Sequence, residues 1–271
     1  SHNLSHLLVS VFNDILAEET YEFEEADLFY KCKYHSENSL YFEFAGFNDK
    51  LHLLMQTVME KFANFRALCT PQKFEIHKEK LRQKIQSKLK RDPYEQCSAF
   101  GGYLYYKKTK SVFQLINDIN DENNALSYDC LLKHYDAILT GKLFVESLIF
   151  GNYTTDLVKQ NLIPLIETPL KNAKEYETEE LLKEKQDYLC MKFAEKTNYI
   201  LRFDSTNEED SNSCIGIDYF CMSDSTKSDD IVDIAKLKLF AWLMDAPFFD
   251  ELRTKQQLGY IVWSFQKYNN G

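Results

Sequence analysis

Arg253 and Tyr260, seven residues apart near the C-terminal end of the chain, are the residues whose types and spacing are best suited to chemistry. The stretch around them predicts a short helix, a stop at Gly259 and then a strand. A fixed cation and a phenolic hydroxyl are both hydrogen-bond donors, and this junction can bring them to one oxygen atom. When a peptide carbonyl is attacked, negative charge grows on its oxygen. One donor aimed at that charge is typically worth about 3–4 kcal/mol.

The same three residues also fit a purely structural interpretation. Gly259 can be the residue that ends a helix in the left-handed conformation. Arg253 can be a solvated residue that interacts favourably with the negative end of the helix dipole, and Tyr260 the first half-buried residue of a strand. Their spacing alone does not separate this interpretation from a pair of oxyanion donors.

Other kinds of active site find little support in the sequence. None of the six histidines belongs to a His-x-x-Glu-His or His-Glu-x-x-His pattern, which a zinc peptidase site of the zincin or inverted type requires. His2 and His6 are one helical turn apart, but no glutamate is near them, so they would hold a metal only adventitiously. A Gly-x-Ser-x-Gly motif and a glycine-rich phosphate loop are also missing. The sequence therefore predicts no metal site and no cofactor in this chain.

Composition narrows the class of protein. The chain has 271 residues, 44% of them hydrophobic, and a formal net charge of −10, so we expect a globular, acidic protein that does not bind nucleic acid. No apolar run approaches 18 residues, so no membrane-spanning segment is predicted. The seven cysteines are odd in number and lack a Cys-x-x-Cys spacing, which favours free thiols and a cytoplasmic location.

Residues 1–167 predict an α+β module. Apolar residues at helical spacing predict a helix from Leu4 to Leu16, and alternation predicts a hairpin over residues 28–34 and 40–45. A helix capped by Asn48 or Asp49 follows. Further expected elements are helices beginning at Pro71 and Pro93, helices over 111–119 and 128–140, a buried strand over 143–150 and a helix over 154–166. The close Gly101-Gly102 pair predicts a tight helix contact.

The sequence of residues 168–271 predicts a linker followed by a second, smaller module. Residues 168–187 are rich in Lys, Glu and Thr and form the linker. Residues 188–271 predict strands over 189–193, 199–203, 215–221 and 260–265, with a long helix over 228–244. A module of this size leaves much apolar surface uncovered, so we expect the natural protein to continue beyond Gly271, and to begin before Ser1.

Three motifs carry a family resemblance. Residues 253–260, with Arg253, Gln257, Gly259 and Tyr260, closely resemble the Arg-Thr-Lys-x-Gln-Leu-Gly-Tyr stretch of the insulysin (pitrilysin-type) zinc metalloproteases. The hairpin followed by Gly-Phe-Asn-Asp-Lys at residues 46–50 resembles a second family motif, with Phe47 in place of Tyr. The Gly-Asn pair at residues 151–152 resembles a third. Together these matches run from near residue 4 to near residue 265.

The resemblance implies an α+β fold of two homologous modules, each an antiparallel-rich sheet packed by helices. They would be the third module and part of the fourth of a peptidase whose zinc lies in its other half. It also implies that Arg253 and Tyr260 contact the backbone of a peptide substrate around the scissile bond. Phe249 matches an aromatic position near that pocket, although plain core packing explains this residue equally well.

In this interpretation the partners are a peptide substrate and the zinc-bearing N-terminal half of the same protein, and a homodimer is possible because dimers are common in the family. Zinc belongs to the full-length enzyme, and the chain alone is expected to be inactive. Two alternatives stay open. One is a catalytically silent family member that serves as a structural or processing subunit. The other is an unrelated α+β interaction domain.

Overall fold

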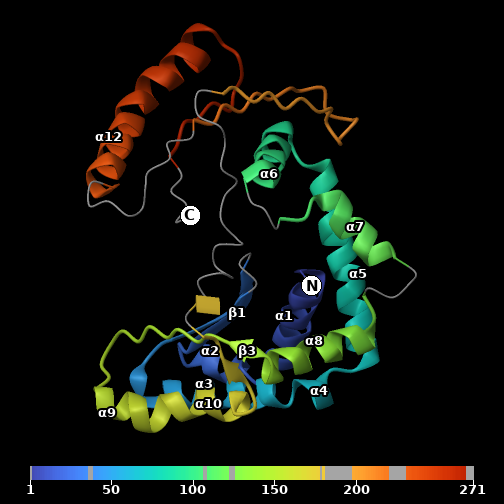
Figure 1. Cartoon of the computed structure of the whole chain (residues 1–271), viewed down its shortest axis with the longest axis vertical. Coiled ribbons are helices and arrows are strands. Elements are labelled where there is room, and N and C mark those ends of the chain that lie inside the picture. Colours follow the sequence, from blue (N-terminus) through green and yellow to red (C-terminus); the bar gives the residue numbers. More distant parts are fainter. Residues whose placement is uncertain are drawn as a thin grey trace. The chain divides into compact units, whose positions relative to one another are not determined.

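The computed structural model describes residues 2–35, 39–105, 109–121, 126–177, 179–180, 197–219 and 230–266. Contacts divide the chain into two compact units, Ser1–Cys214 and Ile215–Gly271, which we call unit 1 and unit 2 (Figure 1). Every buried residue among those described belongs to unit 1. No described helix has the length and apolarity that crossing a bilayer requires.

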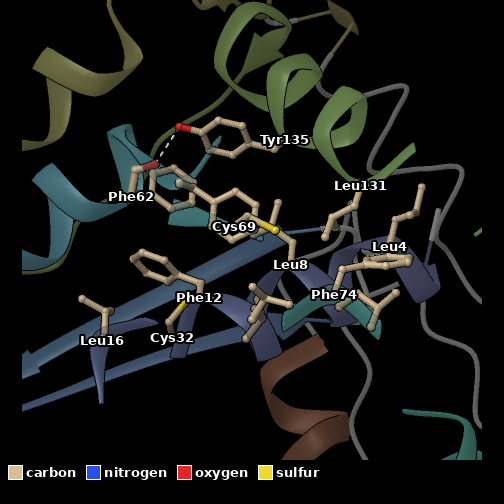
Figure 2. Packing of buried hydrophobic residues seen from close by; sticks show 14 of the residues in the cluster. Leu4, Leu8, Phe12, Leu16, Cys32, Phe62, Cys69, Phe74, Leu131 and Tyr135 are labelled. Carbon is tan, nitrogen blue, oxygen red and sulfur yellow. Dashed lines mark hydrogen bonds between the residues drawn. The ribbon is translucent and has the colours of Figure 1, made fainter. Parts of the chain in front are cut away.

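The core of unit 1 is built around α1 (His2–Leu16), as the apolar stripe predicts. Leu7, Leu8, Val11, Phe12 and Leu16 are fully buried because neighbouring elements cover this helix from several sides. Figure 2 shows Leu8 and Phe12 of α1 among buried side chains from helices and strands far away in the sequence. Among the described elements, those that pack most extensively on α1 are α3, α5, α7, α8 and β1.

The predicted hairpin is confirmed. Strands β1 (Phe29–His35) and β2 (Ser39–Ala45) pair antiparallel, with Cys32 opposite Phe42. A short helix, α2 (Tyr21–Glu25), precedes them. Gly46 ends β2 with a φ of 138°, a region that side chains rarely adopt.

Most of the predicted helices of unit 1 are confirmed. Thr70 caps α5 by accepting a hydrogen bond from the amide of Lys73, and Ser111 and Ser127 cap the two helices that they precede. The helices in this part of the chain are α3 (Asn48–Ala63), α4 (Phe65–Leu68), α5 (Pro71–Ser87), the 3₁₀ helix η1 (Lys88–Lys90), α6 (Pro93–Tyr105), α7 (Val112–Asn120) and α8 (Tyr128–Thr140).

Two local predictions in this region are wrong. Neither Asn48 nor Asp49 caps α3, because the helix already includes both and Phe47 takes the N-cap position without a side-chain hydrogen bond. The Asn48 side chain instead donates to the carbonyl oxygen of Asn152. Among the described residues, the Gly101-Gly102 pair marks no close contact with another helix. A Cβ at Gly102 would meet no atom within 4 Å, and the nearest atom to one at Gly101 is the hydroxyl oxygen of Tyr105, on the same helix, at 3.1 Å.

The buried strand expected over residues 143–150 is also wrong. Only β3 (Lys142–Leu143) is a strand, and it pairs in parallel with β4 (Lys174–Glu175). Leu148 and Phe150 are 96% and 98% exposed. Since a strand needs hydrogen bonds from a neighbour, an apolar run without a paired strand beside it stays irregular.

The helix expected over residues 154–166 forms as three consecutive segments. They are α9 (Thr155–Leu157), the π-helical turn η2 (Val158–Leu162) and α10 (Ile163–Leu170). Leu162 packs against Met55 and Met59 of α3 in a small second core.

The part of the chain beyond the predicted linker, residues 188–271, departs furthest from the predictions. Its long helix α12 runs from Asp230 to Phe249, passes through Pro247 and continues directly into the π-helical segment η3 (Asp250–Lys255). Residues 199–203, 215–219 and 260–265 form no strand, while residues 189–193 and 220–221 lie outside the described part. The described chain is therefore mostly helical with a small antiparallel sheet, which is compatible with an α+β domain.

Candidate functional site

The candidate site lies where η3 ends in unit 2. The amide of Gln256 donates to the carbonyl oxygen of Glu251 at 3.0 Å, and the amide of Leu258 donates to that of Leu252 at 3.1 Å. Between them Gln257 has a φ of 52°, which is the left-handed conformation. This turn closes the helix and reverses the chain. The interpretation that Gly259 supplies the left-handed residue is therefore wrong, because Gln257 does so two positions earlier.

The reversal brings the three predicted site residues together. The guanidinium carbon of Arg253 lies 4.5 Å from the ring centroid of Tyr260 and 5.1 Å from that of Phe249. Both distances fall within the range of a cation–π interaction, which contributes about 0.5–1 kcal/mol at exposed sites. Phe249 and Arg253 are four residues apart on consecutive helical turns, whereas Tyr260 reaches the same cation only through the turn at Gln257.

The solvent exposure of Tyr260 and Phe249 contradicts the structural interpretations of these two residues. Tyr260 is 82% exposed and lies outside any strand, so it is not a half-buried strand residue. Phe249 is 40% exposed and packs on Arg253 rather than in the hydrophobic core. Two rings and a cation thus form an accessible cluster that other molecules can reach.

The charges around this cluster leave Arg253 available to a ligand. Lys255 pairs with Asp250 at 3.0 Å and with Glu251 at 3.3 Å. A hydrogen bond from Gln256, followed by the interaction with Lys255, lowers the pKa of Glu251, so this carboxylate stays ionised and paired. Among the described residues, no carboxylate forms an ion pair with Arg253. The guanidinium carbon lies over both rings, and its planar group carries five N–H donors that a ligand can use.

No donor set for a metal gathers in the described part of the chain. Nowhere among those residues do three His, Cys, Asp or Glu side chains come together as a metal site would need. The rings of His2 and His6 are 4.6 Å apart and pack edge-to-face against Tyr34. Burial, together with the charges of His2, Lys84 and Lys88, lowers the pKa of His6 to about 4. Neighbouring ammonium groups also oppose a metal cation, so these two histidines serve packing.

One polar cluster was not anticipated from the sequence. The Ser10 hydroxyl is 2.7 Å from Nδ1 of His77, and Nε2 of His77 is 3.5 Å from a carboxylate oxygen of Asp14, which also pairs with Lys73. Ser10 and Asp14 lie one turn apart on α1 and His77 lies on α5, so the cluster joins two helices. His77 is only 5% exposed, and burial lowers its pKa, which fits a satisfied core histidine and not a catalytic base open to substrate.

Protein-family models match two parts of the chain, one at each end. A model described as the middle or third domain of peptidase M16 matches residues 1–118. A second model, described as the C-terminal lobe domain 4 of the PQQ synthase PqqF-like family, matches residues 239–271 and so includes the Arg253 cluster.

Curated proteins are similar along nearly the whole chain. Insulin-degrading enzyme-like 1, peroxisomal, from Arabidopsis thaliana is 26% identical over 272 residues, which is 99% of this chain and 26% of that protein. The insulin-degrading enzyme of Homo sapiens is 26% identical over 270 residues, again 99% of this chain and 25% of that protein. The putative zinc protease mug138 of Schizosaccharomyces pombe is 28% identical over 95% of this chain and 25% of that protein.

The chain thus spans about a quarter of the length of the curated relatives that it matches. These matches exclude the alternative of an unrelated interaction domain. With one family model at each end and end-to-end similarity between them, the chain belongs to the insulysin-type M16 peptidase family, of which it is a fragment.

Proposed function

We propose that this chain is the substrate-binding part of an insulysin-like zinc metalloendopeptidase and that it contributes the third module and part of the fourth. Residues 1–167 are the third module, 168–187 a linker and 188–271 the fourth module. The order of the two family matches, a third domain followed by a domain 4 of a C-terminal lobe, supports this arrangement. The names of relatives, which include a putative zinc protease and insulin-degrading enzymes, support peptide hydrolysis as the activity of the full-length protein.

In this proposal Arg253 and Tyr260 hold the carbonyl oxygen of the scissile peptide bond. The guanidinium edge and the phenolic hydroxyl each donate a hydrogen bond to that oxygen, and both bonds strengthen as negative charge grows on it. In the same proposal Phe249 lines the pocket and holds the guanidinium through its ring, which lies 5.1 Å from the guanidinium carbon.

The described residues do not offer a zinc site, so no step of the reaction is assigned to a metal held by this chain. We propose that the N-terminal half of the full-length protein holds the zinc. That half and the peptide are the proposed partners of this chain, while the homodimer and the cytoplasmic location stay predictions. The second candidate is a catalytically silent family member. The presence or absence of zinc ligands in the N-terminal half would distinguish it from an active enzyme.

The convergence of Phe249, Arg253 and Tyr260 is the observation that carries the proposal. In the full-length protein, Tyr260→Phe should lower kcat on a fluorogenic peptide by about 10²–10³, because one oxyanion donor is lost. Tyr219, which is 89% exposed in the same unit, offers a matched control. Tyr219→Phe makes the same chemical change and should leave kcat as it is.

An unchanged kcat for Tyr260→Phe, with normal folding, would overturn the role of this hydroxyl. The purified fragment provides a separate test. It should not cleave the peptide even with added zinc, and zinc-dependent cleavage by the fragment alone would contradict the assignment of the metal to the other half.

A further inference from the structure

One buried glutamine of unit 1 gathers a polar cluster around itself. Gln96, on α6, is 4% exposed. Its amide nitrogen donates to the carbonyl oxygen of Arg91 at 2.7 Å and to the hydroxyl of Ser205 at 3.2 Å. Its amide oxygen accepts from the backbone amide of Thr206 at 2.9 Å. Both donors and the acceptor of this side chain therefore have partners, without which burying the amide would cost free energy.

The same cluster supplies partners to the backbone carbonyl groups between α5 and α6. Carbonyl oxygens at the end of a helix have no partner within that helix. The Thr206 hydroxyl donates to the carbonyl oxygen of Leu89 at 2.6 Å, and the Asn207 side chain donates to that of Lys90 at 3.4 Å. The next carbonyl along the chain is the one that the buried glutamine serves. Three consecutive carbonyl groups therefore obtain hydrogen bonds from this cluster.

An aromatic contact attaches the same segment one turn further along α6. The ring centroids of Phe100 and Phe203 are 4.1 Å apart. We call residues 203–207 the strap, because they are the part of this segment that binds α6 and the turn before it. None of the strap residues belongs to the hydrophobic clusters that the described residues form. The strap is therefore held mainly by polar bonds and one pair of rings.

The chain on both sides of the strap is open to solvent. Within residues 197–214, the half-buried residues are 205–207 and 210, and all the others are exposed. Contacts nevertheless place this stretch in unit 1, which ends at Cys214, although the sequence predicts residues 188–271 to form the second module. A stretch that the sequence assigns to the second module is thus attached to unit 1 at a few residues.

We propose that the strap opens and closes on α6 as one unit, with Gln96 as its catch, while the core of unit 1 stays folded. Polar bonds of this kind exchange with bonds to water at a small net cost, and one pair of rings is a small apolar contact. Segments with few buried apolar contacts open more easily than the whole domain unfolds. Opening frees the chain from Phe203 to Cys214, the last residue before unit 2. The catch therefore controls how much free chain leads to unit 2.

Limited trypsin cleavage of the full-length protein measures how often the strap opens. Arg202 immediately precedes the strap and is exposed, so cleavage after it follows the population of the open form. Gln96→Leu removes the amide bonds of the catch at nearly unchanged volume and should raise this cleavage rate by about tenfold. Hydrogen exchange over residues 203–207 should accelerate with it, while exchange in α1 should stay as in the unmodified protein.

Two further variants complete the test. Gln56→Leu is the matched control, because Gln56 is exposed on α3 and bonds to Glu60 of the same helix at 2.7 Å. The same chemical change there should leave cleavage after Arg202 unchanged. Thr206→Val keeps the shape of its side chain and removes the hydroxyl bond to Leu89. This milder variant lies outside the core and should raise the cleavage rate by about threefold to tenfold.

Cleavage after Arg202 at the unmodified rate in folded Gln96→Leu would overturn the proposal. If that variant does not fold, Thr206→Val decides alone, and an unmodified rate there has the same meaning. Exchange in α1 that accelerates in parallel with exchange over residues 203–207 would also overturn it, because the strap would then open only together with the core.

Discussion

Asn48 and Asn152 are joined by a hydrogen bond, from the side-chain amide of Asn48 to the backbone carbonyl oxygen of Asn152, at 3.4 Å. The neighbouring Tyr153 returns a bond, from its hydroxyl to the carbonyl oxygen of Asn48, at 3.2 Å. The Gly-Phe-Asn-Asp-Lys and Gly-Asn motifs, which are distant in the sequence, therefore meet where α3 begins. Polar residues that look like local caps and turns serve a contact between two segments.

This contact predicts energetic coupling between the two motifs. Asn48→Ala and Tyr153→Phe should each lower the free energy of unfolding by about 0.5–1.5 kcal/mol, the usual net value of one hydrogen bond. The double variant should lose less than the sum, because either change loosens the same contact. Urea unfolding of the four proteins measures this cycle, and strict additivity would argue against a shared contact.

Gly46 and Gly102 should respond in opposite ways to alanine. At Gly46 the φ is 138° and an added Cβ would lie 2.5 Å from the carbonyl oxygen of Asp27, so we expect a loss of more than about 2 kcal/mol. At Gly102, within α6, the same change meets no atom within 4 Å among the described residues, and should stabilise by about 0.5–1 kcal/mol. Thermal unfolding of both variants measures the difference, and a loss of stability in Gly102→Ala would reveal a contact there.

Tyr135 should make unit 1 sensitive to alkali. Its buried hydroxyl donates to the carbonyl oxygens of Phe62 at 2.7 Å and Ala63 at 2.8 Å, and Figure 2 shows the first of these bonds. Burial raises the pKa of Tyr135 to about 12. Since the folded state holds the proton more tightly than the unfolded state, the associated stability is complete below about pH 10 and is lost as the pH rises towards 12.

The measurement is the urea midpoint of the chain at pH 8 and pH 11. Tyr135→Phe should lower the midpoint at pH 8, because two carbonyl groups lose their partner, and should weaken its fall towards pH 11. Tyr21, which is 61% exposed, gives the matched Tyr→Phe control and should change neither value. An identical pH dependence in Tyr135→Phe would show that other groups titrate in this range.

His6 and His134 should make unit 1 lose stability as the pH falls, the opposite of the effect of Tyr135. Burial is the first cause that lowers the pKa of each to about 4. The unfolded chain binds these protons near pH 6.5, so stability is complete above that pH and is lost as the pH falls towards 4. His134→Gln, whose amide can replace the hydrogen bond to Ser5, should flatten the decline of the urea midpoint between pH 7 and 4.5. Exposed His35→Gln should not, and an unchanged slope in both variants would contradict burial as the cause.

Local pattern was enough to predict most of unit 1. The stripe from Leu4 to Leu16, the alternation in the hairpin and the prolines at 71 and 93 all act within one element, and the structure confirms those elements. The run over residues 143–150 failed because a strand depends on its neighbour, and the sequence of one strand does not reveal whether it is paired. The cap at Asn48 failed because α3 begins at Asn48 itself, with Phe47 in the N-cap position, and the Asn48 side chain donates to a distant partner, Asn152.

The candidate site was predictable in its residues but not in its geometry. Motif similarity selected Phe249, Arg253 and Tyr260, yet the predicted junction used Gly259 as the turning residue. In the structure a wide π-helical turn moves the reversal to Gln257, and this change of position sets Tyr260 on the guanidinium.

The stacking of Phe249 on Arg253 leads to a final prediction, which rests on the proposed function. If the ring positions the guanidinium, Phe249→Leu should lower kcat of the full-length protein by about two- to fivefold, the equivalent of about 0.5–1 kcal/mol of cation–π interaction. Phe249→Trp keeps an aromatic face and should retain kcat. KM should change in both variants alike if the side chain also lines the pocket. Equal losses of kcat in Phe249→Leu and Phe249→Trp would instead show that the shape of the side chain matters and not its interaction with the cation, because only the leucine variant removes the aromatic face.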